Sequence, residues 1–140
     1  MTKSEALKVL TILQAAYPAA YKITDKDDAA LMANVWAVQF ADFSAEVVFM
    51  AINKLISTSR FAPSIAEVKD KIRAIAWESW DALEASKYGE NKLSAEEYQR
   101  FARIYEGTKE YKYKRVIEPT VAQMVQHSLN GNLPALGNGE

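Results

Sequence analysis

The chain has 140 residues, of which 49% are hydrophobic and 25% charged, with a formal net charge of -1. These values suit one compact soluble domain, alone or with a small appendage, and they give no reason to expect general electrostatic attachment to nucleic acid or anionic lipid. The absence of cysteine excludes disulfides, thiolate metal ligands and cysteine nucleophiles. No apolar run reaches the roughly 18–20 residues of a membrane span. The apolar residues near the start have helical spacing instead of a signal-peptide layout. We therefore expect a cytoplasmic protein without membrane contact.

The first part of the sequence predicts three helices. Thr2 and Glu5 form a capping box, and Pro18 ends the helix that follows. A second helix is expected from the acidic start near Asp25, and a third from Ser44. The apolar faces expected are Leu7, Leu10 and Leu13 in the first helix, Leu31, Val35 and Val38 in the second with Trp36 and Phe40 on its flank, and Val47, Val48, Ala51, Ile52 and Leu55 in the third.

The next stretch, residues 57–68, reads STSRFAPSIAEV and separates two helices. Pro63 prevents the third helix from continuing. We expect Phe61 to fold back as an apolar plug, which leaves Arg60 as the exposed candidate for contact with a partner. Most of the stretch is thus predicted to be a structural corner.

A fourth helix is expected to start at the capping box of Ser64 and Glu67 and to run to about residue 87. Trp77 and Trp80 lie three residues apart and share a face of this helix. We expect later helices to cover them; the alternative is that they form a surface for a partner or a second copy, where tryptophan is favoured.

The rear part predicts looser helices. Ser94 and Glu97 form a third capping box, and a weaker helix follows Pro119. The fold class expected is all-α: a small bundle of about four N-terminal helices plus one or two looser C-terminal helices. The units expected are a helical N-terminal domain at 1–87, a helical or partly disordered partner-binding segment at 88–130, and a disordered tail at 131–140.

A search for catalytic chemistry gives little. There is no glycine-rich phosphate loop, and the single histidine, His127, has no obvious carboxylate partner. Asp25, Asp27 and Asp28 lack the spaced glycine and distal glutamate of a calcium loop. We therefore expect no enzyme, with no catalytic residue, no cofactor and no metal.

One stretch combines cations and aromatic rings. It consists of Lys109, Tyr111, Lys112, Tyr113, Lys114 and Arg115, with Glu110 among them. Interleaved cations and rings can hold phosphates and stack on bases. Short mixed runs are also common as solvated connectors, which is what we expect here, with direct nucleic-acid contact as the alternative.

The order of motifs from the first helix to the fourth resembles the phage family of replicative helicase loaders and inhibitors. The resemblance covers about the first half of the chain. It depends on a tryptophan in NVWAVQFADFSAEVVFMAINKLI followed by STSRFAPSIAEVKDKI. Its structural signature residues are Trp36, Phe61, Pro63, Ser64 and Glu67.

The resemblance implies a small all-helical N-terminal domain without its own ATPase, working in the host bacterial cytoplasm. Such a protein binds a replicative hexameric helicase, inhibits it, and delivers it to an origin-bound replication protein. The family's C-terminal part is implicated in contacting the helicase. The partner-binding candidates are therefore Arg60, the basic and aromatic run of residues 109–115, and the apolar residues Val121, Met124, Val125 and Leu129.

Two other functions stay open. The first is a helical DNA-binding regulator of replication or transcription, with the helix SIAEVKDKIR as the candidate for groove entry. That helix carries Lys69, Lys71 and Arg73, but its first turn is acidic, which disfavours major-groove binding. The second is a structural or assembly protein of a virus particle, which only the resemblance disfavours.

Overall fold

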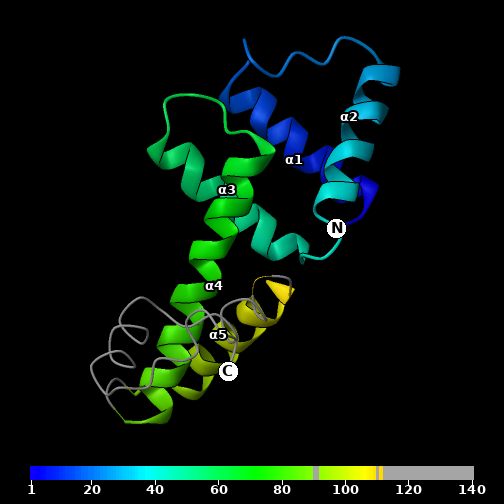
Figure 1. Ribbon diagram of the computed structural model, residues 1–140. Coiled ribbons are helices and arrows are strands. Elements are labelled where there is room, and N and C mark those ends of the chain that lie inside the picture. Colours follow the sequence, from blue (N-terminus) through cyan, green and yellow to red (C-terminus); the bar gives the residue numbers. More distant parts are fainter. Residues whose placement is uncertain (90–91, 110, 112–140) are drawn as a thin grey trace, which may run out of the picture.

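A computed structural model describes residues 1–89, 92–109 and 111 of the chain and has five helices within them (Figure 1). These helices are α1 (Lys3–Ala16), α2 (Lys26–Gln39), α3 (Ala45–Thr58), α4 (Ile65–Lys87) and α5 (Ala95–Glu106). No strand occurs in the described residues, and the predicted all-α class is confirmed. None of the described helices is both long and apolar enough to cross a lipid bilayer. The helix predicted after Pro119, with His127, and the tail at 131–140 lie outside the described residues.

Local capping fixes where the helices begin. All three predicted capping boxes are confirmed, at Thr2 for α1, Ser64 for α4 and Ser94 for α5. In each box the hydroxyl accepts from the third helical N–H, and the glutamate there accepts from the cap N–H. Asp25 and Ser44 cap α2 and α3. These caps satisfy donors that the first helical turn would otherwise leave unpaired.

The core lies where α1 and α3 meet the first half of α4. The fully buried aliphatic side chains are Val9, Leu10, Leu13, Val47, Val48, Ile52, Val68 and Ile72. A row of aromatic rings continues this core. The ring centroids of Trp36 and Phe40 are 5.3 Å apart, those of Phe40 and Phe43 6.1 Å, and those of Phe43 and Tyr111 5.3 Å. This row links α2 to the end of the described chain.

The buried face of α2 differs from the prediction. Leu31, Val35 and Val38 are 65%, 45% and 68% exposed, while Trp36 and Phe40 are buried. Both sides of this helix are apolar, so its periodicity cannot select one. The aromatic side is buried because large rings remove more apolar surface from water than valine does. The expected inward position of Leu7 is also wrong, since it is 41% exposed.

The second half of α4 extends beyond the first three helices, and α5 packs along it (Figure 1). Ile75, Ala76 and Ser79 of α4 are buried, as are Ile104 and Tyr105 of α5. α5 therefore packs on the body of the protein. The unit boundary expected near residue 87 stays a prediction.

Trp77 and Trp80 stack on each other, with ring centroids 5.5 Å apart and an interplanar angle of 23°. Each of the two residues is half-buried. Their pairing combines features of both expectations, because each ring is partly covered and partly open to solvent. A role for the pair in contacting a partner or a second copy stays a prediction.

Candidate partner-binding site

The polar groups of the described residues act mainly in structural contacts. Within these residues no group of three or more metal-ligating side chains comes together. The carboxyls with perturbed pKa values have structural causes: the cap backbone N–H lowers the pKa of Glu5 and Glu97, and the Arg103 guanidinium lowers that of Glu46. The candidate site is therefore sought among surfaces that a partner can contact.

The loop between α3 and α4 is fixed at both ends. The Tyr17 hydroxyl donates to the Ser59 carbonyl at 2.8 Å, and the Tyr21 hydroxyl donates to the Pro63 carbonyl at 2.6 Å. Within the loop, the Ser59 hydroxyl donates to the carbonyl of Phe61 at 2.8 Å. Both tyrosines come from the segment that joins α1 to α2. The loop is thus held by a part of the chain 42 residues away.

At the centre of this loop, Phe61 is 77% exposed. The prediction that it folds back as an apolar plug is therefore wrong. Pro63 is fully buried and takes the inward place instead. Between Ser59 and Pro63, both held by tyrosines, the ring of Phe61 remains outside. Arg60 is exposed as expected, and it forms no ion pair with the described residues.

The basic and aromatic run is described only at Lys109 and Tyr111. Lys109 is exposed. Tyr111 is 4% exposed, stacks on Phe43, and has the Arg73 guanidinium 4.8 Å from its ring centroid. Its ring is therefore covered by the protein's own side chains, unlike the exposed ring that base stacking requires. The remaining partner-binding candidates lie outside the described residues: Lys112, Tyr113, Lys114, Arg115, Val121, Met124, Val125 and Leu129.

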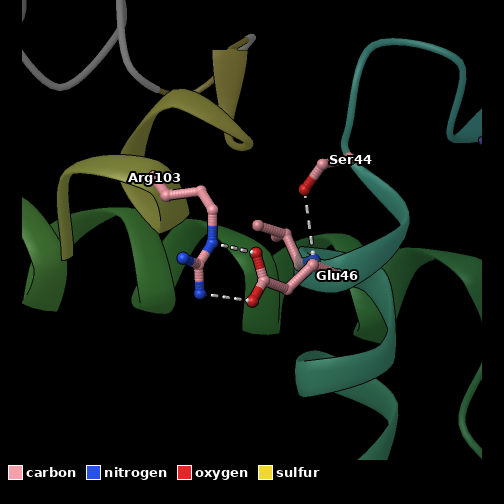
Figure 2. A network of polar contacts seen from close by, with 4 residues as sticks. Ser44, Glu46 and Arg103 are labelled. Atoms are coloured by element: carbon pink, nitrogen blue, oxygen red, sulfur yellow. Dashed lines mark hydrogen bonds and ion pairs between the residues drawn. The ribbon is translucent and has the colours of Figure 1, made fainter. Parts of the chain in front are cut away.

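A junction between α3 and α5 was not foreseen from the sequence (Figure 2). Arg103 makes a two-pronged contact with Glu46, Nε to Oε1 at 2.9 Å and Nη2 to Oε2 at 3.0 Å. The backbone N–H of Ser44 donates to the Gly107 carbonyl at 3.0 Å, and the Ser44 hydroxyl accepts from Val47 N–H. The one available signal was Gly107 directly after a predicted helix, which is a common place for glycine.

Gly107 is required by the closeness of this approach. A Cβ placed there would overlap the Ser44 hydroxyl and lie 2.6 Å from a methyl of Val47. The end of α5 is therefore seated directly on the start of α3. This junction fixes the direction in which the chain reaches Tyr111.

Two further apolar surfaces are open to solvent. One is the exposed side of α2, where Leu31, Val35 and Val38 border a shallow hollow of about 230 Å³. The other is a groove of about 550 Å³ between α1 and α3, whose apolar lining is Leu7, Ile12 and Phe49. Exposed apolar surfaces of this kind are candidates for protein contact.

The cations of α4 face the protein itself. Lys69 Nζ lies 3.0 Å from the Gln39 side-chain oxygen and 5.9 Å from the Phe40 ring centroid. Arg73 lies over the Tyr111 ring. Glu67 is occupied in the cap of α4. Two of the three cations proposed for groove entry thus already have intramolecular partners.

Comparison with known proteins agrees with the resemblance seen in the sequence. The family model for the N-terminal domain of gp39P-like phage helicase loaders and inhibitors matches residues 1–69. The match spans α1, α2, α3, the α3–α4 loop and the first turn of α4, and it includes all five signature residues. The comparisons with curated proteins and with solved structures give no match.

Proposed function

We propose that this chain, whose residues 1–69 belong to the gp39P-like family of phage helicase loaders and inhibitors, is a replication adaptor. It binds a replicative hexameric helicase, holds its ATPase and unwinding activity down, and delivers it to an origin-bound replication protein. The observation that carries this proposal is the family match. We place this activity in the cytoplasm of the host bacterium.

The proposal assigns different contacts to the front and rear of the chain. Residues 1–87 form the helical N-terminal domain, residues 88–130 supply the helicase contact, and residues 131–140 are a tail. The cations of the run at 109–115 and the apolar side chains at 121–129 are the proposed contact groups. Tyr111, buried against Phe43, anchors the start of this segment to the body.

Size-exclusion chromatography tests the proposal. The full chain is mixed with the hexameric helicase of its host or phage at micromolar concentration. We expect the two proteins to elute together at a fixed ratio, ahead of the free adaptor. Separate elution of the two proteins at these concentrations contradicts the adaptor function.

A charge-reversal variant separates this function from that of a DNA-binding regulator. Replacing Lys112, Lys114 and Arg115 with glutamate removes the densest cluster of cations in the chain. A DNA regulator must then lose a salt-sensitive affinity for duplex DNA, since phosphate contacts carry that dependence. The adaptor has no such affinity to lose, and the variant weakens only its helicase complex.

A further inference from the structure

Phe61 leaves an apolar ring in water although the fold has a covered core nearby. Burying a phenylalanine side chain is worth about 1.5–3 kcal/mol. Single exposed hydrophobic residues are nevertheless common, so the exposure of 77% decides nothing alone. The way in which the loop is held provides the second observation.

Three hydrogen bonds fix the loop on either side of the ring, from Tyr17 to Ser59, from Tyr21 to Pro63, and within the loop from Ser59 to Phe61. The Tyr21 ring also packs edge-on against Trp36, with centroids 6.5 Å apart. The tie therefore reaches into the aromatic core. A contact residue that is already held in place loses less conformational entropy on binding.

Arg60, next to this ring, indicates the chemistry of the partner. Its guanidinium is exposed and has no ion-pair partner among the described residues, so it is free to bind a carboxylate or a phosphate. Attachment to nucleic acid takes several cations, because affinity grows with the number of phosphates contacted. Here the neighbours are the hydroxyl side chains of Ser57 and Thr58 and the carboxylate of Glu67, while Lys54 pairs with Glu78 at 3.5 Å. The surroundings therefore favour a carboxylate.

We propose that Arg60 and Phe61, together called the tip, form a preformed docking point for a protein. Phe61 enters an apolar pocket of that protein, and Arg60 pairs with a carboxylate at the edge of the pocket. Exposed, well-held aromatic and arginine side chains are typical binding hot spots.

The partner is the origin-bound replication protein, an assignment that rests on the proposed function. An adaptor needs two separate surfaces to hold two proteins at once. The tip lies before the first turn of α4, whereas the rear segment leaves the body at Tyr111, next to Arg73 in the middle of that helix. Figure 1 shows the α3–α4 loop and α5 at opposite ends of α4. The tip can thus be occupied while the rear segment holds the helicase.

Binding of the full chain to the immobilised, purified origin-binding protein tests the inference. We expect Phe61→Ala to weaken this binding by about 30-fold or more, the size of a hot-spot loss. Arg60→Glu should weaken it by about 10-fold, because the charge then opposes a carboxylate. The variant Tyr17→Phe/Tyr21→Phe, which keeps both rings but frees the loop, should weaken it by about 3-fold to 10-fold.

The controls separate docking from folding. Val38→Ala shortens another exposed apolar side chain and should leave the binding unchanged. The melting temperature of Phe61→Ala should equal that of the wild type, because the ring is mostly outside the core. Helicase co-elution should be the same for wild type and all tip variants.

The outcomes distinguish this inference from the proposed function. If the wild type binds both proteins and Phe61→Ala binds the origin protein equally well, the inference is wrong and the adaptor function stands. If Phe61→Ala loses the helicase or a labelled single-stranded oligonucleotide instead, the assignment to the origin protein is overturned. If the wild type does not elute with the helicase, it is the proposed function that fails.

Discussion

The two junctions made by α3 use similar hydrogen bonds for opposite ends. At the α3–α4 loop, tyrosine hydroxyls hold the carbonyls of Ser59 and Pro63, and the ring between them stays outside. At the α3–α5 junction, the Ser44 N–H holds the carbonyl of Gly107, and the next ring, that of Tyr111, is buried. One junction displays an aromatic side chain and the other encloses one.

This difference separates stability from binding. Substitutions at the closed junction should lower the free energy of unfolding, since they remove packing or introduce overlap. Substitutions of Arg60 or Phe61 should change binding while stability stays the same. The predictions below test the closed junction first and then the ties that hold the open one.

The largest loss of stability is expected for Tyr111→Ala. It removes a buried ring that stacks on Phe43 and lies under Arg73, so the free energy of unfolding should fall by about 3 kcal/mol. Urea unfolding followed by circular dichroism measures this. The matched control is Tyr88→Ala, at a tyrosine that is 71% exposed, and it should change little. Equal losses in the two variants would show that the enclosure of Tyr111 is not stabilising.

Gly107→Ala should cost about 2 kcal/mol, because its methyl group overlaps Ser44 and Val47. Gly89→Ala is the matched comparison. It meets no atom within 4 Å but has a φ of +80°, so it reports backbone strain alone, at about 1 kcal/mol. Thermal unfolding of both variants compares the two costs. A larger loss at Gly89 than at Gly107 contradicts the tight seating of α5 on α3.

Tyr21→Phe should lower the free energy of unfolding by about 1 kcal/mol, through loss of the hydrogen bond to the Pro63 carbonyl. Tyr98→Phe is the control, since its side chain is 41% exposed and its hydroxyl donates to none of the described residues. Burial raises the pKa of Tyr21 above its ordinary value of 10.0, with the Glu67 charge as a smaller cause. The stabilisation should therefore be complete below pH 10 and be lost as the pH rises through the raised pKa. A tie that weakens between pH 7 and 9 is the contrary result.

The smallest effect is expected at the exposed pair of Glu46 and Arg103. Arg103→Gln should cost about 0.5 kcal/mol at neutral pH, because solvent screens an exposed ion pair. The Arg103 hydrogen bond lowers the pKa of Glu46 below 4.5, so this stabilisation is present above pH 4.5 and disappears as the pH falls through the lowered pKa. A double-mutant cycle with Glu46→Gln isolates the pair. A coupling energy that persists at low pH contradicts the assignment.

The sequence predicted the local features of the fold better than the long-range ones. The helix starts at Thr2, Ser64 and Ser94 were predicted because each capping box is formed by residues three apart. The buried side of α2 was not, since both of its sides are apolar and the choice depends on the aromatic row that includes Phe40. Local pattern therefore located the helices without deciding which surfaces remain exposed.

The candidate site shows the same limit. Arg60 was expected to be exposed and is. Phe61 was misplaced because its position depends on hydroxyl groups of Tyr17 and Tyr21, which no local motif connects to this loop. The sequence identified the loop as the family's signature, but the outward ring became visible only once the segment between α1 and α2 was seen to hold it.

The ATPase rate of the hexameric helicase, measured as the full chain is added, tests the adaptor function most directly. We predict that the rate falls to a low plateau and that the plateau is reached when each helicase hexamer has bound its full complement of adaptor. An unchanged rate at concentrations where chromatography shows the complex to be complete contradicts the role of helicase loader and inhibitor.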